Sequence, residues 1–212
     1  MHVTEIFMSI QGESTYAGLP CVFVRLAGCN LNCSWCDTAY ARAYDGATDM
    51  DVGRVLDEVG RFKCGLVEIT GGEPLLQEEA KELAKRLLDG GYTVLIETNG
   101  SLPLAGVDAR AIKIIDVKCP SSGHAGSFLP ENLGHIGPDD EVKFVIGDKA
   151  DYDCARRFLD EYIGDRTSKI LFAPVAPALT PKELAGWILR DSLRVRLQVQ
   201  LHTYIWGAER GR

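Results

Sequence analysis

The sequence predicts an α/β fold in a single domain of 212 residues, an open partial (β/α) barrel of mostly parallel strands with an edge strand at the C-terminus. Three observations support this prediction. From residue 21 onward, β-rich segments alternate with amphipathic segments, which is typical of parallel strands joined by crossover helices. Inner segments such as 112–117 are rich in β-branched residues, as strands covered on both faces are. The last segment, 195–201, alternates apolar and polar residues, and this period of two indicates a half-exposed edge strand.

The strand segments follow one another at regular intervals along the chain. The predicted strands are 22–26, 66–70, 93–98, 112–117, 142–146, 169–172 and 195–201. Residues 120–137 interrupt this alternation. They are rich in Ser, Gly, His and Pro, and we expect a loop without regular structure there.

Helical periodicity fills most of the intervals between these strands. Apolar residues recur every three or four positions in three segments, which predicts helices over 52–62, 78–88 and 152–163. Gly90 and Gly164 follow the last two of these segments as stop signals. A further helix begins after Thr180, because Thr180, Pro181 and Glu183 form a capping box with proline at the first helical position.

Composition and charge exclude several classes of protein. The 23 basic and 30 acidic residues give a net charge of −7, which argues against a nucleic acid as the main partner. Residues 1–14 lack the basic start and apolar run of a secretory signal, and no apolar run approaches the about 18 residues of a membrane helix. We therefore expect a cytoplasmic protein with no membrane partner. The odd number of cysteines, seven, then favours a metal site over disulfides.

Polar residues and glycines follow nearly every predicted strand. The segments 28–38, 71–74 and 97–100 each come directly after a strand, and Lys118 and His202 follow two others. In α/β folds of this kind, ligands bind at the carboxyl ends of the strands. We therefore expect the active site at that edge of the sheet.

The strongest chemical signal is a cysteine triplet. Cys29, Cys33 and Cys36 have the spacing C-x3-C-x2-C, and three thiolates on a short loop can hold three irons of a [4Fe-4S] cluster while the fourth iron stays open. Zinc is the alternative, but structural zinc requires a fourth ligand, which would have to come from Cys64, Cys119 or a histidine. Thiolates in this pattern favour the iron–sulfur cluster.

Two motifs resemble the radical S-adenosylmethionine (SAM) enzymes. One is the cysteine triplet with an aromatic residue, Trp35, before the third cysteine, and the other is Gly-Gly-Glu-Pro at 71–74 after the next strand. The resemblance implies that residues 1–212 form one radical SAM domain with a barrel of the radical SAM type. It also implies two cofactors, a [4Fe-4S] cluster and SAM.

Further segments narrow the resemblance to one family over nearly the whole chain. The segments 5–7, 10–13, 24–25, 28–29, 35–38 and 200–203 are similar to those of the 7-carboxy-7-deazaguanine synthases of the queuosine pathway. That resemblance implies a lyase that converts 6-carboxy-5,6,7,8-tetrahydropterin to 7-carboxy-7-deazaguanine with release of ammonia, and that requires Mg2+ as well.

The resemblance also assigns residues to each ligand. The substrate would contact Ile10, Gln11, Gly12, Glu13, Arg25, Thr70 and His202. Thr38 would bind Mg2+, whose preferred ligands are hard oxygens. SAM would contact Trp35, Cys36, Asp37, Gly72, Glu73, Glu97, Asn99, Asp116, Val117, Lys118, Ala173, Pro174, Val175 and Ala176.

Arg25, from the substrate set, and Ser14, which follows Glu13, each have a physical argument of their own. Arg25 lies in an otherwise apolar strand, where an unpaired charge is costly. It would clamp the substrate carboxylate, and the alternative is a salt bridge to Glu13 or Asp37. Ser14 departs from the family pattern, which has glycine there, so a backbone with positive φ would be strained at this serine.

Two other functions share part of this pattern. A glycyl-radical-enzyme activating protein has the same triplet but acts on a protein, and an iron–sulfur or zinc binding module has no activity. Gln11, Gly12, Glu13, Arg25 and Thr38 favour the pterin substrate over a protein substrate. The binding module stays open, and the colour of an anaerobically reconstituted sample and its response to SAM would decide it. The expected partners are the pterin, an electron donor of the flavodoxin or ferredoxin kind, and a second copy of the chain in a homodimer, suggested by the apolar C-terminal strand edge with Trp206.

Overall fold

A computed structural model describes residues 1–167, 169–207, 209 and 211. Its strands are β1 (His2–Ile10), β2 (Pro20–Leu26), β3 (Thr48–Asp49), β4 (Leu66–Gly71), β5 (Thr93–Thr98), β6 (Ile112–Asp116), β7 (Glu141–Ile146), β8 (Lys169–Pro174) and β9 (Arg196–Leu197). Its α-helices are α1 (Val52–Gly60), α2 (Glu79–Asp89), α3 (Lys149–Phe158), α4 (Pro181–Arg190) and α5 (Leu201–Trp206).

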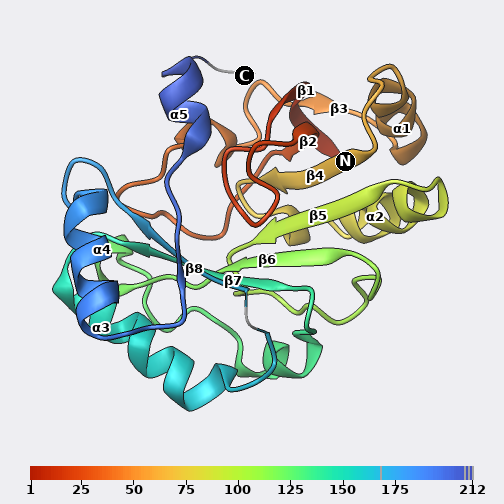
Figure 1. Ribbon diagram of the computed structural model, residues 1–212. Coiled ribbons are helices and arrows are strands. Elements are labelled where there is room, and N and C mark those ends of the chain that lie inside the picture. Colours follow the sequence, from red (N-terminus) through yellow and green to blue (C-terminus); the bar gives the residue numbers. More distant parts are fainter. Residues whose placement is uncertain (168, 208, 210, 212) are drawn as a thin grey trace.

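These strands form one sheet in the order β3-β1-β2-β4-β5-β6-β7-β8-β9 (Figure 1). From β2 to β9 each pair of neighbours is parallel, while β1 is antiparallel to both β2 and β3. The order begins at β3 and ends at β9, so the sheet is open. The prediction of an open, mostly parallel α/β barrel is confirmed.

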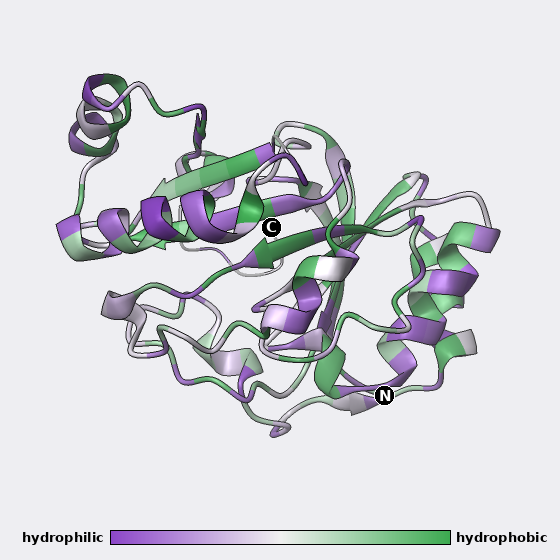
Figure 2. Cartoon of the chain, turned by 90° about the horizontal axis from the view of Figure 1, so that it is seen from below, coloured by the Kyte–Doolittle hydropathy of each residue, from purple (hydrophilic) through white to green (hydrophobic). Residues whose placement is uncertain are grey.

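The two faces of the sheet have different surroundings. Helices α1 to α4 cover one face, and residues such as Val55, Leu83, Tyr152 and Leu184 belong to the main apolar core there. Figure 2 shows largely hydrophobic strands beside helices that carry both hydrophilic and hydrophobic residues. None of the helices in the described part of the chain is long and apolar enough to cross a membrane.

The opposite face, called the inner face below, carries the alternate residues of the central strands. A second, smaller apolar cluster lies on it, formed by Cys21, Phe23, Leu66, Leu95 and Ile114. The remaining positions of the same alternation are polar: Arg25, Glu68, Thr70, Glu97, Asp116, Glu141 and Lys143. The inner face of the sheet is therefore part apolar and part charged.

Most predicted elements lie within a few residues of their predicted bounds. The capping box at Thr180 is present, with Glu183 N–H donating to Thr180 Oγ1 at 3.2 Å and the Glu183 carboxylate accepting from Thr180 N–H at 3.1 Å. The predicted helix 152–163 is two elements, because α3 continues as a π-helical turn over Leu159–Ile163.

Three predictions need correction. Strand β1 was not predicted, because most of its side chains are half-buried and its sequence has no clean period of two. The predicted edge strand 195–201 is only two residues long, since the chain then turns into α5. The loop 120–137 contains two 3-10 helices, Pro120–Ser122 and Pro130–His135.

The β1–β2 hairpin places its connecting loop, residues 11–19, against the inner face. Gln11 N–H donates to Leu19 O at 2.8 Å and Gly18 N–H to Gln11 O at 2.8 Å, which closes the loop. Thr15 N–H donates to both oxygens of Glu141 on β7, at 3.1 and 3.0 Å. The loop joins β2 at its amino end, and the cysteine loop follows β2 at its carboxyl end. The hydrogen bonds to Glu141 nevertheless hold loop 11–19 against the inner face.

The capping box gives a direct test of local stability. Thr180→Ala removes the side chain that accepts the Glu183 N–H, and we expect a loss of about 1 kcal/mol in the free energy of unfolding. Chemical denaturation monitored by circular dichroism measures this change. Thr180→Ser keeps the hydroxyl and serves as the control; an equal loss in both variants would contradict the assignment.

Candidate active site

The three cysteines of the triplet lie on the loop that follows β2. All three are free, half-buried thiols. A second segment, residues 119–124, braces this loop: Ser34 N–H donates to Ser122 O at 3.1 Å, Trp35 Nε1 to Ser121 Oγ at 3.0 Å, and Asn32 N–H to His124 Nε2 at 2.9 Å. Part of the segment predicted to be irregular thus supports the cysteine loop.

The electrostatics of the triplet suit a bound metal cluster. Burial raises the pKa of Cys29 and of Cys33. Glu73 and Cys36 raise the pKa of Cys29 further, and Asp116, Cys36 and Cys29 do the same for Cys33. Lys118 opposes this effect on both, since a nearby cation favours the thiolate. Soft thiolates beside a buried cation are an appropriate donor set for iron–sulfur ligation.

The spacing of the three thiol groups bears on whether they would bind one metal ion or a cluster. Among the residues that the structure describes, no three His, Cys, Asp or Glu side chains are grouped closely enough to hold one metal ion. A cubane cluster requires a wider arrangement than a single ion does, because each thiolate binds a different iron. The residues present fit such a cluster in number, chemistry and position after β2.

Gly71 and Gly72 bring the end of β4 against the start of the cysteine loop. Gly71 has φ of +149°, and a Cβ there would overlap the carbonyl oxygen of Leu26. A Cβ on Gly72 would overlap the carbonyl oxygen of Gly28 and lie 2.7 Å from Cβ of Cys29. The two glycines therefore allow a backbone approach that any larger residue would block.

Glu73 is placed as a buried brace between two loops. Its carboxylate accepts from Leu75 N–H at 3.0 Å, Thr98 Oγ1 at 2.8 Å and Asn99 N–H at 2.7 Å. Burial raises the pKa of Glu73 to about 7, although these hydrogen bonds favour the charged form. Glu73 thus holds the loop after β4 to the loop after β5, where Asn99 lies.

The other residues predicted to bind SAM lie at or just after the carboxyl ends of β5, β6 and β8. Asn99 Nδ2 donates to Asn30 Oδ1 of the cysteine loop at 3.2 Å. Lys118 donates to Asp116 at 2.9 Å and lies 5.3 Å from the ring centre of Trp35, which joins the end of β6 to the same loop. The segment 173–176 lies at the end of β8, and Val175 N–H donates to Ile146 O at 2.9 Å. Val117 N–H donates to Lys143 O at 2.9 Å.

A buried lysine, Lys143, was not predicted and forms the centre of the inner face. Its Nζ lies 2.8 Å from Glu13, 2.5 Å from Glu97 and 3.6 Å from Asp116. Burial alone would lower the pKa of Lys143, but these three carboxylates outweigh it and raise the pKa well above its usual value. Thr70 Oγ1 donates to the same Glu97 at 3.1 Å. Lys143 is a charged residue inside an apolar strand, which is the same signal that singled out Arg25 in the sequence.

Arg25 pairs with a carboxylate that was not considered. Its Nε donates to Glu5 Oε1 at 2.7 Å across the β1–β2 pair, so the alternative of a salt bridge to Glu13 or Asp37 is wrong. Tyr40 donates to the same Glu5 oxygen at 2.7 Å. Burial alone would lower the pKa of Arg25, but Tyr40 and Glu5 raise it, so the guanidinium is charged.

The segment after β9 closes over the loop that contains Glu13. Gln198 Nε2 donates to Glu13 Oε2 at 3.0 Å, and Gln200 Nε2 donates both to Glu13 Oε1 at 2.9 Å and to Asp37 Oδ2 at 3.0 Å. Figure 1 shows the chain between α4 and α5 (blue) running back toward the N-terminal half of the molecule. Both glutamines lie in the segment 195–201 that was predicted to be a half-exposed edge strand.

Two further predicted residues meet at the same place. His202, in α5, packs on Gly12 so closely that a Cβ on this glycine would overlap the imidazole ring. Leu201 N–H donates to Gly12 O at 2.9 Å. Ile10 ends β1 immediately before Gln11, so the predicted substrate segment and the C-terminal histidine lie together.

Ser14 has the left-handed backbone that the family's glycine would adopt more easily. Its φ is +64°. The strained residue is held by its surroundings: its N–H donates to Gln198 Oε1 at 2.8 Å, and its Oγ accepts from Tyr16 N–H at 3.0 Å. These hydrogen bonds hold Ser14 in the left-handed conformation.

Thr38 lies at the end of the cysteine loop and is half-buried, next to the exposed Asp37. Its Oγ1 donates to Asp37 Oδ1 at 3.2 Å and lies 4.0 Å from Cys36 Sγ. Hydroxyl and carboxylate oxygens are hard ligands.

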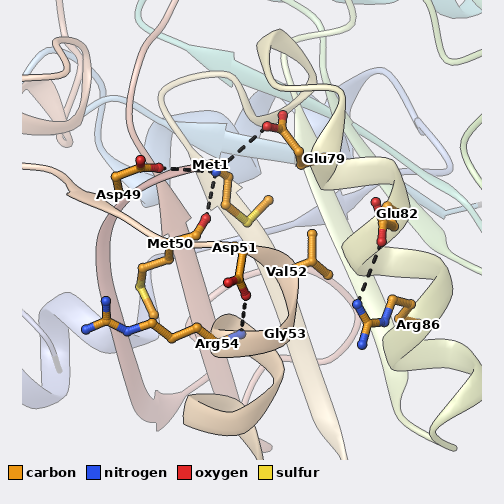
Figure 3. Close-up of a pocket in the computed structure, with 10 residues that line it drawn as sticks. All are labelled: Met1, Asp49, Met50, Asp51, Val52, Gly53, Arg54, Glu79, Glu82 and Arg86. Atoms are coloured by element: carbon orange, nitrogen blue, oxygen red, sulfur yellow. Dashed lines mark hydrogen bonds and ion pairs between the residues drawn. The ribbon is translucent and has the colours of Figure 1, made fainter.

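A cavity of about 740 Å³ opens elsewhere on the molecule (Figure 3). It is lined by residues of β3, α1 and α2 and by Met1, whose amine donates to Met50 O at 2.7 Å. None of the predicted site residues lines this cavity.

An open α/β barrel with a cysteine triplet at the end of β2 defines a radical SAM enzyme, and residues 24–123 match the Radical SAM superfamily. The crystal structure of QueE from Escherichia coli has the same fold, with a TM-score of 0.81 over 95% of this chain and 94% of that one at 23% identity. Proteins named 7-carboxy-7-deazaguanine synthase from Koribacter versatilis (strain Ellin345) and Chlorobaculum tepidum are 47% and 44% identical to this chain. Each match covers 99% of this chain, and 98% and 96% of the respective relative. The chain belongs to the 7-carboxy-7-deazaguanine synthase family.

Gly72→Ala tests whether the close approach of β4 positions the cysteine loop. The added Cβ would displace Gly28 or Cys29, so we expect most of the iron bound after anaerobic reconstitution to be lost. Iron and sulfide analysis with the visible absorption spectrum measures this. Gly186→Ala is the matched control, because a Cβ there has no neighbour within 4 Å. Full iron content in Gly72→Ala would show that the approach is not required.

Proposed function

We propose that this chain converts 6-carboxy-5,6,7,8-tetrahydropterin to 7-carboxy-7-deazaguanine with release of ammonia. The observation that carries this proposal is the pairing of a cysteine triplet with a charged inner face in a chain that is 47% identical to a 7-carboxy-7-deazaguanine synthase over almost its full length. Membership of that family favours this function over a glycyl-radical activating protein or a binding module without activity.

The cofactor end of the site lies along the loops after β2, β4, β5 and β6. Cys29, Cys33 and Cys36 would hold a [4Fe-4S] cluster, and Gly72 would let the backbone approach SAM beside it. When bound, this pair supplies the radical that removes a hydrogen atom from the substrate. The chain itself holds the loops in place through Glu73 and Lys118. The segment 173–176 would close the SAM site from the end of β8.

The substrate end lies on the inner face. Arg25 would bind the substrate carboxylate, because Glu5 fixes its Nε and orients the guanidinium. Glu13 would accept hydrogen bonds from the pyrimidine edge of the pterin, while Lys143, Gln198 and Gln200 hold its carboxylate. Thr70 and His202 would complete the contacts.

Mg2+ would bind at Thr38, next to the cysteine loop. The adjacent Asp37 oxygen, 3.2 Å from the hydroxyl, supports a site for a hard cation, and substrate oxygens and water would complete the octahedron. In that position the cation would neutralise substrate oxygens close to the cofactor.

The partners follow from the same chemistry. An electron donor of the flavodoxin or ferredoxin kind would reduce the cluster, and the enzyme would work in the cytoplasm. A second copy of the chain would cover the exposed apolar side chains of the C-terminal segment, namely Leu197, Val199, Tyr204 and Ile205, in a homodimer.

Anaerobic turnover tests the reaction. With reconstituted protein, SAM, a reductant and the carboxytetrahydropterin, we expect 7-carboxy-7-deazaguanine and ammonia. Mass spectrometry and an ammonia assay measure them. Cys33→Ala is the control for cluster-dependent chemistry and should give no product. Wild-type protein with a full cluster that forms no deazaguanine would overturn the proposed function.

Thr38→Ala tests the magnesium site separately. We expect this variant to lose most of the rate increase that Mg2+ gives the wild type, because one oxygen ligand is removed. Titration of the initial rate with Mg2+ measures the effect. Thr38→Ser retains the hydroxyl and should respond as the wild type does; an unaltered Mg2+ response in Thr38→Ala would place the cation elsewhere.

A further inference from the structure

A buried carboxyl that the proposed mechanism does not use lies directly behind the substrate loop. Glu68 is in the middle of β4 on the inner face, and it is 4% exposed. Gln11, 3% exposed, donates an amide N–H to Glu68 Oε2 from 57 positions away in the sequence. A carboxyl in this position is costly unless it serves a partner.

The hydrogen bond to Glu68 settles which way the Gln11 amide points. At its other end, Gln11 Oε1 accepts from Glu13 N–H at 3.0 Å. Rotating the amide by half a turn would set its N–H group against the Glu13 N–H and its oxygen against Glu68. Because both ends are assigned, the amide has one favoured orientation.

The surroundings of Glu68 favour its neutral form. Burial raises its pKa well above the usual value, and the charges of Glu97 and Glu13 raise it further, while Lys143 and the bond from Gln11 oppose them. Cys21 on β2 faces Glu68 as well. A protonated carboxyl has one oxygen that accepts and one hydroxyl that donates. It can therefore accept from Gln11 and direct its hydroxyl toward the neighbouring anions.

On the basis of the proposed function, we propose that Glu68 is a positioning residue that selects the 4-oxo form of the substrate ring through Gln11. Held by Glu68, the Gln11 amide presents its second N–H as a donor next to the accepting carboxylate of Glu13. A 2-amino-4-oxo pyrimidine edge offers the complement, a carbonyl that accepts beside N–H groups that donate. A 4-amino ring would place a donor against the donor of Gln11.

Equilibrium binding of two stable pteridines tests this without turnover. We would titrate the reconstituted protein with 6-carboxypterin and with its 4-amino analogue and follow the fluorescence of each. For the wild type we expect about 100-fold tighter binding of the 4-oxo ligand. Glu68→Leu frees the Gln11 amide. The ratio of the dissociation constants of the 4-amino and 4-oxo ligands should then fall below about 10, chiefly because 6-carboxypterin binds more weakly.

Glu68→Gln is the conservative variant. Its amide oxygen can accept from Gln11 as the protonated acid does, so the ratio should stay within about threefold of the wild type. Gln11→Leu should reproduce the loss seen in Glu68→Leu, and the double variant should lose no more than either single one, because the two residues act as a unit. Gln11→Leu also provides the test if Glu68→Leu does not fold.

Asp140→Asn is the matched control for loss of a buried carboxyl. Asp140 is 3% exposed and pairs with Lys113 at 2.9 Å, away from Gln11. It should lower the melting temperature and leave the ligand ratio unchanged. The proposal is overturned if Glu68→Leu keeps the wild-type ratio, if Glu68→Gln loses it, or if the wild type does not distinguish the two ligands.

Turnover separates this proposal from the proposed function. Wild-type protein that distinguishes the ligands but forms no deazaguanine would refute the reaction and leave the role of Glu68 supported. In an active enzyme, Glu68→Leu should raise KM for the carboxytetrahydropterin about 10-fold with kcat within about twofold, because orientation at the pyrimidine edge affects binding more than the chemical step. A fall of about 10-fold in kcat with unchanged KM would overturn the positioning role.

Discussion

One buried ammonium group connects the parts of the inner face. Lys143 on β7 contacts carboxylates from the loop after β1, from β5 and from β6, and its nearest partner in sequence is 27 positions away. Because a buried ammonium group is costly without carboxylate partners, displacing any of these segments would weaken the pairing of Lys143. The loop that carries Gln11 and Glu13 also packs Tyr16 against the small apolar cluster of the inner face. Its polar anchors are this ammonium group and the carboxyls of Glu68 and Glu141.

A second constraint acts at the opposite end of the site. Gly71 and Gly72 let two backbones approach closely, and Glu73 then accepts two hydrogen bonds, from Thr98 at the end of β5 and from Asn99 in the loop after it. The cysteine loop is thus held by steric fit and hydrogen bonds, while the substrate loop is held by charge. Close packing tolerates little displacement, whereas ion pairs can exchange partners with water and ligand polar groups. This division suits a site in which the cluster stays and the substrate must come and go.

The sequence predicted the central strands and the cysteine loop well, because both have strong local signals. Segments such as 66–70 and 93–98 are apolar and bounded by glycines, and the triplet is a short motif. It did not predict that Arg25 would pair with Glu5, since β1 itself has no clean period of two and was not recognised as a strand. Glu68 and Lys143 were visible as charges in apolar strands, but only the folded sheet shows that they face the same loop. Pairings across 57 and 130 positions have no local pattern to reveal them.

In the C-terminal segment, the period of two in the sequence led to a wrong prediction of a seven-residue edge strand, and the reason is chemical. Residues 195–201 alternate as an edge strand should, yet the polar members Gln198 and Gln200 face inward and bind Glu13. A period of two identifies residues that share a face, but it does not say whether the polar face meets water or buried carboxylates. The same Gln200 amide also donates to Asp37, so one side chain joins the carboxylate at the substrate end to a carboxylate beside the cysteine loop. A displacement of either carboxylate must strain or break a bond to the other. The position of the substrate loop and the position of the loop that carries the cysteines are therefore not independent.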